Sequence, residues 1–215
     1  MPDISFALVM NLLGLGISVF ISRFAFAGYA AVGSPNLLRL TFAFISISAG
    51  FAIIVGSLFV QPAYSQPLMT AGLAAQTIGY FFIALSHGLK KSFDFAPAPR
   101  FAFIPLALTP FIIPGNSIEH LIRSISFILL VYVSIETMAA YMQSRKTSTL
   151  MIGSGLGLLA TAELIAWYDF IYPGIFAYPA LAIKVAGFGL LFIPFSKFGL
   201  STGLGKVNSQ IGSGV

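Results

Sequence analysis

Long apolar runs with few charged residues constrain this chain more than any other sequence feature. They lie at residues 4–22, 37–60, 68–89, 118–142, 147–167 and 174–195. An α-helix rises about 1.5 Å per residue, so about 20 apolar residues cross a hydrocarbon core of about 30 Å. Only 8% of the residues are charged and 58% are hydrophobic, whereas a soluble domain carries roughly a quarter charged residues. The sequence therefore predicts an all-α, polytopic membrane protein.

A seventh apolar run, residues 101–114, is short and contains Pro105 and Pro110. As a helix it would cover roughly two thirds of the hydrocarbon core, so it is either a kinked span or a re-entrant segment. Charge placement decides between them, because cytoplasmic loops carry an excess of Lys and Arg. If all seven runs cross, one side holds Arg23, Arg39, Lys90, Lys91, Arg100, Arg145, Lys146, Lys197 and Lys206, and only Arg123, with Asp3, Glu119 and Asp169, lies near the other. We therefore expect seven transmembrane helices in the cell membrane, with the N-terminus outside and the C-terminus in the cytoplasm.

The first three and last three spans resemble each other. Ala27-Gly28-Tyr29 matches Ala139-Ala140-Tyr141, and Asn36-Leu37-Leu38 matches Ser148-Thr149-Leu150, at a constant spacing of 112 residues (27 to 139, 36 to 148). Residues 74–80 match residues 182–188. This pattern predicts a parallel 3+1+3 repeat, as in some transporters, although apolar helices also resemble one another by chance. The expected units are residues 1–92, a linker helix at 93–117, residues 118–200, and a flexible cytoplasmic tail at 201–215.

Charged residues at membrane depth are candidates for function, because they are costly in lipid. Lys184 lies near the middle of the last span, and Gln76 is its counterpart in the first repeat. Helix rise places Glu163 within about 5 Å of Lys184 in depth and Glu136 about 10 Å away, so Glu163 is the expected partner. Arg123 is a competitor for Glu163. A structural ion pair, a proton or ion path, and a ligand site are all open interpretations.

Other polar and aromatic features suggest no chemistry of their own. The sequence has no cysteine, and His87 and His120 are expected near opposite membrane faces, so no metal site is expected. The loop at 167–173, with Tyr178, is typical of an interfacial aromatic belt, or it forms the mouth of a pocket leading to Glu163 and Lys184. Small residues in the last two spans indicate close helix packing: Gly153, Gly155, Gly157, Gly187 and Gly189.

Two resemblances bear on function. Lys184 in the last span, followed by Val185 and Gly187-Phe188-Gly189-Leu190, resembles the retinal-attaching helix of microbial rhodopsins, which implies retinal as a cofactor. The sequence departs from that family at Ala180, where a carboxylate is usual, and Trp167 is its only tryptophan. The 3+1+3 layout resembles small sugar transporters with two three-helix repeats, but the first and fifth spans lack the proline of that group.

The sequence shows no catalytic constellation, so we expect no enzyme and, apart from the retinal resemblance, no cofactor. The leading hypothesis is an accessory or structural subunit of a larger membrane complex, or a compact sensor-like module. Its partners would be membrane lipid and other membrane subunits or further copies of the chain, and not nucleic acid, because the basic residues flank apolar runs. The alternative is a small-solute or proton-linked transporter that uses Lys184 and Glu163.

Overall fold

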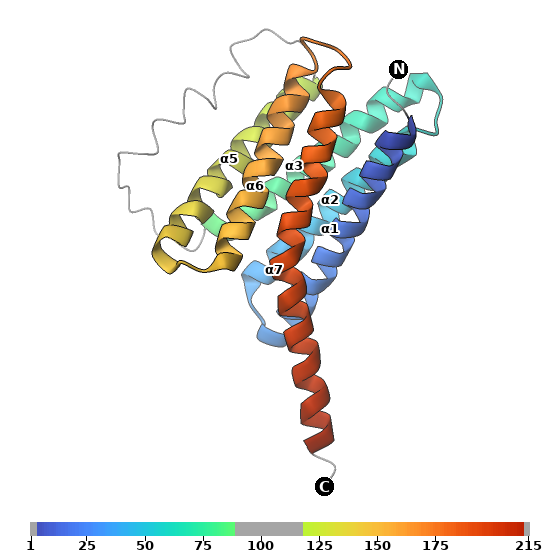
Figure 1. The fold of residues 1–215 in the computed structure, drawn as a ribbon. Helices are drawn as coiled ribbons and strands as arrows, with labels where there is room; N and C mark the ends of the chain where they lie inside the picture. The colour runs from blue at the N-terminus through green and yellow to red at the C-terminus, as the bar shows by residue number, and fades with distance from the viewer. Residues whose placement is uncertain (1–3, 89–117, 213–215) are drawn as a thin grey trace.

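A computed structural model describes residues 4–88 and 118–212 of the chain. These residues form six helices: α1 (Ile4–Val32), α2 (Pro35–Ser57), α3 (Pro62–Gly88), α5 (Ile118–Ser144), α6 (Thr147–Tyr168) and α7 (Ala177–Gly212). Successive helices pack on each other within a first set, α1–α3, and within a second set, α5–α7. The contacts of α3 with α5 and of α7 with α1 join the two sets into a closed bundle, in which α7 lies beside α1 (Figure 1).

All six helices are long and apolar enough to cross a membrane. The all-α fold class predicted from the sequence is confirmed for the described residues, and the apolar helices are compatible with a membrane-embedded protein. Large hydrophobic side chains cover the outside of the bundle, among them Phe20, Phe59 and Ile118, which are exposed. Lipid is the solvent that accepts such a surface. The predicted span at residues 101–114 lies outside the described residues.

Several helices are longer than the sequence predicted. α1 continues past Arg23 to Val32, because no proline interrupts it and one arginine can extend its charge toward water. It ends at Gly33, whose φ of 67° suits a helix C-cap and whose N–H donates to the Tyr29 carbonyl at 2.7 Å. α3 begins at Pro62, since proline is well tolerated in the first helical turn. α7 extends to Gly212 and includes most of the expected tail, whose mobility stays a prediction.

Glycines bring neighbouring helices of each set into backbone contact. A Cβ on Gly79 of α3 would lie 2.7 Å from the Ala43 carbonyl oxygen of α2, and one on Gly187 of α7 would lie 2.9 Å from the Gly155 carbonyl oxygen of α6. Such approaches are the usual basis of helix packing in lipid. The same interpretation is not supported for Gly189, because a Cβ there would meet no atom of the described residues within 4 Å.

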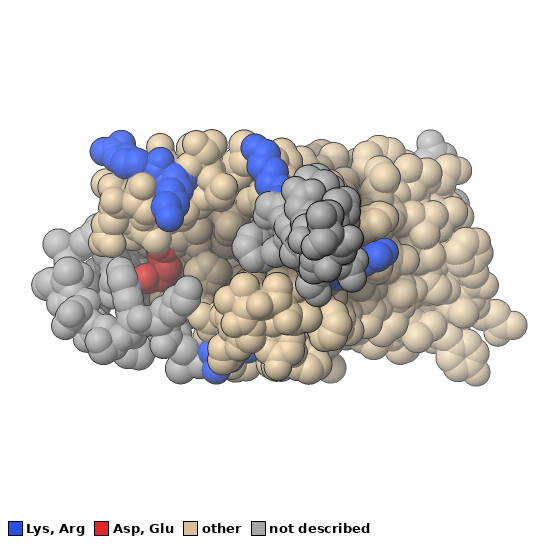
Figure 2. Space-filling view, turned by 90° about the horizontal axis from the view of Figure 1, so that it is seen from below, with Lys and Arg blue, Asp and Glu red and all other residues tan. Residues whose placement is uncertain are grey.

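Basic side chains gather at one end of the bundle. Viewed from below, Lys and Arg side chains are visible around the end toward which α7 runs (Figure 2). The basic residues near the chain turns at this end are Arg39 at the start of α2 and Arg145 and Lys146 between α5 and α6. By contrast, Arg123 lies near the start of α5 and Lys184 lies two turns into α7, so these two cations belong to the other half of the bundle.

Gly187 and Gly189 offer a matched test of this packing. We expect Gly187→Ala to destabilise the protein by about 1–3 kcal/mol, because its methyl group would press on the backbone of α6. Gly189→Ala adds a methyl group in open space and is expected to be neutral or stabilising by up to about 1 kcal/mol, since alanine is the better helix former. Denaturant titration of the purified protein measures both, and equal losses would contradict the assigned packing.

Candidate functional site

Four charged side chains of alternating sign form a continuous chain across α5, α6 and α7. Nζ of Lys184 lies 2.6 Å from Oε1 of Glu163. Nη1 of Arg123 lies 3.5 Å from Oε2 of Glu163, and Nη2 of Arg123 lies 2.9 Å from Oε1 of Glu119. The structure thus places Glu163 between two cations. Two carboxylates and two cations balance each other, which is what a site with little access to water requires.

Burial increases along this chain from Glu119 to Glu163. The side chains of Glu119 and Arg123 are 17% and 11% exposed, whereas those of Lys184 and Glu163 are 9% and 2% exposed. Removing one partner of such a pair would leave a buried charge without compensation. The ion pair is therefore a strong constraint on how α6 and α7 sit against each other.

Gln76 of α3 connects this chain to the first set of helices. Its Oε1 accepts a hydrogen bond of 2.9 Å from Nζ of Lys184. Gly50 of α2 makes room for the amide, because a Cβ there would lie 2.6 Å from Cγ of Gln76. Nε2 of Gln76 and the hydroxyl of Tyr80 are buried and have no hydrogen-bond partner within the described part of the chain. A buried donor without a partner is unfavourable, so a ligand or a water that reached Nε2 of Gln76 would gain a hydrogen bond there.

A cavity of about 420 Å³ opens beside Lys184, and we call it the Lys184 cavity. Its polar lining residues are Asn11, Ser57, Gln76, Glu119, Arg123, Asp169, Tyr178 and Lys184, and the other described residues of its wall are apolar. Asp169 accepts hydrogen bonds from the backbone N–H groups of Gly174, Phe176 and Ala177, which fixes the loop between α6 and α7. The volume falls in the range of small-molecule sites.

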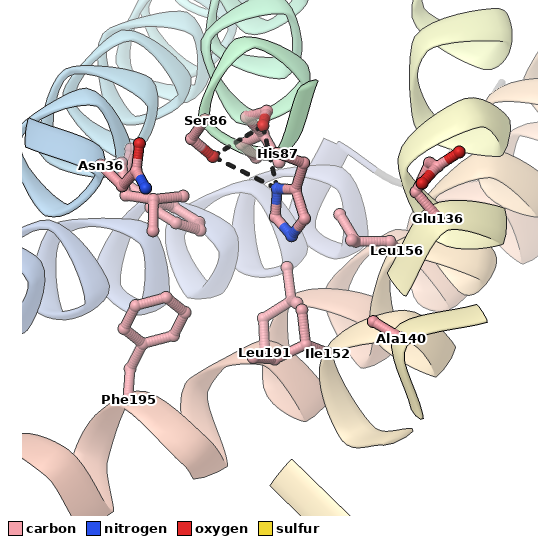
Figure 3. Close-up of a pocket in the computed structure, with 12 residues that line it drawn as sticks. Asn36, Ser86, His87, Glu136, Ala140, Ile152, Leu156, Leu191 and Phe195 are labelled. Carbon is pink, nitrogen blue, oxygen red and sulfur yellow. Dashed lines mark hydrogen bonds between the residues drawn. The ribbon is translucent and has the colours of Figure 1, made fainter. Parts of the chain in front are cut away.

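A second cavity, of about 450 Å³, lies farther along the same helices, and we call it the His87 cavity. Asn36, Ser86, His87 and Glu136 are its polar lining residues. The His87 ring points from α3 toward Leu191 and Ile152 (Figure 3). Glu136, a secondary candidate from the sequence, therefore belongs to this cavity and not to the Lys184 network.

A closed layer of side chains separates the two cavities. On α3, Gln76 lines one cavity and Ile83 the other, with Tyr80 between them at helical spacing. On α7, Phe188 lies in the same way between Lys184 and Leu191. The layer consists of Ile47, Phe51, Tyr80, Leu159 and Phe188, each at most 1% exposed. The rings of Phe51 and Phe188 meet edge to face with centroids 5.4 Å apart. In the described part of the chain, these buried side chains therefore lie between the two cavities.

The aromatic side chains at the end of α6 and in the loop after it lie in two different environments. Trp167 is only 2% exposed and stacks on His120, with ring centroids 5.2 Å apart, so its assignment to an interfacial belt is wrong. Phe170 and Tyr178 line the Lys184 cavity, in agreement with the alternative in which this loop forms the mouth of a pocket. Sequence reasoning missed Tyr80, although Gln76, Tyr80, Ile83 and His87 follow helical spacing and so share one face of α3.

The described residues contain no group of three or more His, Asp or Glu side chains that could hold a metal ion. For retinal, the described lining residues of the Lys184 cavity include two aromatic side chains, Phe170 and Tyr178. Retinal stays a prediction of the sequence resemblance, and this lining adds no support to it.

Comparison of the chain with protein families, curated proteins and solved structures gave no match.

The ion pair predicts that single and double substitutions change the stability of the protein by different amounts. We expect Glu163→Gln alone to destabilise the protein by about 3–5 kcal/mol, because it leaves the buried ammonium of Lys184 without its carboxylate partner. Lys184→Met alone is expected to cost less, since Glu163 keeps Arg123 as a counter-charge. The double variant removes both charges while Glu119 still balances Arg123, so it is expected to recover most of that loss. Unfolding in denaturant provides the measurement. A double variant as unstable as the sum of the two singles would contradict the pairing.

Proposed function

We propose that this chain is a membrane carrier for a small solute that binds at Lys184, Glu163 and Gln76. The observation that carries the proposal is the pair of cavities along the same helices, separated by a closed layer at the level of Tyr80 and Phe188. A carrier needs a site that is reached from one side at a time, and two cavities with a closed layer between them suit that requirement. Because the layer is closed, we favour a carrier over an open channel.

The packing supports a rocking motion of one set of helices against the other. The tight glycine contacts lie inside the sets, between α2 and α3 at Gly79 and between α6 and α7 at Gly187. The main helix contacts between the sets are those of α1 with α7 and of α3 with α5. Each set is thus held together by backbone contacts, and the polar contact between Gln76 and Lys184 lies where the sets meet.

The two sets have equivalent helix ends, which supports the proposed parallel repeat. α1 ends at Val32 and α5 ends at Ser144, and the next helices begin at Pro35 and Thr147. Both turns have a residue of positive φ, Gly33 at 67° and Arg145 at 52°. The N–H groups of these residues donate to the carbonyls of Tyr29 and Tyr141, both at 2.7 Å. Each of these pairs keeps the spacing of 112 residues (33 to 145, 29 to 141) seen in the sequence.

Equivalent contacts between helices support the repeat further. Oγ of Ser22 donates to the Thr41 carbonyl at 3.5 Å, and Oγ of Ser134 donates to the Gly153 carbonyl at 3.0 Å. Donor and acceptor both shift by the same number of positions (22 to 134, 41 to 153). Gly79 and Gly187, which match in the sequence, likewise approach the equivalent carbonyls of Ala43 and Gly155. Shared individual contacts of this kind favour the proposed repeat over chance similarity of apolar helices.

We further propose that the chain crosses the cell membrane seven times, with the N-terminus outside. α3 and α5 run in the same direction, because Met69 and Glu119 near their starts line one cavity, and His87 and Glu136 farther along line the other. A chain that leaves α3 at one end of the bundle must return to the other end to enter α5. This requirement supports a crossing by the predicted span at 101–114, and the basic residues at one end support a cytoplasmic C-terminus.

The subunit hypothesis also remains a proposal. It would rest on the exposed apolar surface of the bundle. Because lipid covers such a surface as well as a protein partner does, that surface gives the subunit hypothesis no specific support. The carrier hypothesis has the cavities in its favour.

Alternating access is testable with introduced cysteines, because the natural chain has none. Ala166 lines the Lys184 cavity and Ala140 lines the His87 cavity. In right-side-out vesicles we expect a membrane-impermeant maleimide to label Ala166→Cys from outside. In inverted vesicles we expect it to label Ala140→Cys. The reversed pattern would contradict the proposed orientation but not the two cavities.

The double variant Ala140→Cys/Ala166→Cys tests the carrier itself. In a carrier, a bulky label in one cavity holds that cavity open and closes the other, so the second cysteine is expected to react at least about tenfold more slowly. Each single variant supplies the control rate. Unchanged rates in the labelled double variant would overturn the carrier and favour a static bundle.

A further inference from the structure

Among the described lining residues of the Lys184 cavity, the charged side chains all come from one set of helices. Glu119, Arg123, Asp169 and Lys184 belong to α5–α7 or to the loop after α6, whereas the lining residues from α1–α3 are uncharged. Gln76 is the counterpart of Lys184 in the proposed repeat, and both line this cavity. A ligand in this cavity therefore meets a charged wall on one side and a largely apolar wall on the other, which suits a small amphipathic molecule.

The charge balance of the wall restricts the head group of that molecule. Glu119, Arg123, Glu163 and Lys184 form a neutral chain, and Asp169 is occupied by three backbone N–H groups. A ligand with a net charge would upset this balance in a site that holds little water. A ligand with one positive and one negative group preserves it, because each group can contact the opposite charge of the chain.

The burial of the lining residues suggests where the negative group and the positive group of the ligand bind. The unpartnered Nε2 of Gln76 offers a donor beside Lys184, so a carboxylate fits there. Of the four linked side chains, that of Glu119 is the most exposed, at 17%, and its carboxylate can accept hydrogen bonds from an ammonium group. Ile54, Leu73 and Leu181 supply apolar wall for a side group.

We propose that the Lys184 cavity binds a small zwitterion with an apolar side group, such as an apolar amino acid. This proposal deepens the carrier function and rests on it for its role in transport, but binding can be tested separately. A sugar would use hydroxyl groups without need of the charged wall, and a simple cation or anion would leave one half of the charged chain without a counterpart.

The test is a series of probes that share one branched alkyl group and differ in charge. L-leucine is the zwitterion, 3-methylbutylamine the cation, 4-methylpentanoate the anion and 4-methylpentanamide the neutral compound. Equilibrium binding of radiolabelled L-leucine to the purified full chain in nanodiscs, with the other three as competitors, ranks them directly. We expect L-leucine to bind at least about tenfold more tightly than each of the others, since each lacks at least one charge-assisted contact.

Two variants test whether L-leucine binds at the lining residues of the Lys184 cavity. Gln76→Leu is expected to weaken L-leucine binding about tenfold or more, because the carboxylate loses its donor. Thr161→Val is the control, since Thr161 is exposed and bonds only within its own helix, and it is expected to leave binding unchanged.

The possible outcomes separate this proposal from the carrier. Absence of L-leucine binding, or equally tight binding of the amine or the carboxylate alone, would overturn the zwitterion proposal while the cysteine experiment still decides the carrier. Independent reaction of the two cysteines together with tight, Gln76-dependent L-leucine binding would instead leave a zwitterion-binding protein that is not a carrier.

Discussion

The buried ion pair between Lys184 and Glu163 is the interaction on which the rest of the structure depends. An ammonium group at this depth needs a counter-charge, and the pair in turn needs further hydrogen bonds to offset its loss of water. Arg123 contacts Glu163, and Gln76 accepts a hydrogen bond from Lys184. Gly50 has no side chain and so leaves space for Gln76. These contacts therefore join α3 to the helices of the second set at one level of the bundle.

A buried ion pair by itself adds little net stability, because desolvation offsets much of the attraction. The backbone contacts of α2 with α3 and of α6 with α7 hold each set together by other means, at Gly79 and Gly187. Because the glycine contacts already hold each set together, the four charged side chains can have a role besides stability. Through the hydrogen bond of Lys184 to Gln76 they also reach the first set of helices, so they would respond to the relative movement that we propose for the two sets.

The level of a side chain along the bundle could be predicted from the sequence, whereas the choice of neighbouring helices could not. Helix rise alone put Glu163 at the level of Lys184 and Glu136 at another level, and the structure has Lys184 beside Glu163 and Glu136 in the other cavity. The burial of Trp167 against His120 and the layer around Tyr80 depend on which helices are neighbours. Hydrophobicity in a membrane helix does not reveal that order, because its lipid-facing and buried sides are equally apolar.

A purely structural ion pair would predict a different environment from the one observed. Such a pair requires only its own hydrogen-bond partners and close packing, since empty space beside buried charges weakens both. Here the pair borders a cavity of about 420 Å³, and the amide that touches Lys184 retains a buried donor without a partner in the described chain. These two features leave both space and an unfilled hydrogen bond at the same place, which is the arrangement expected of a site that a solute completes.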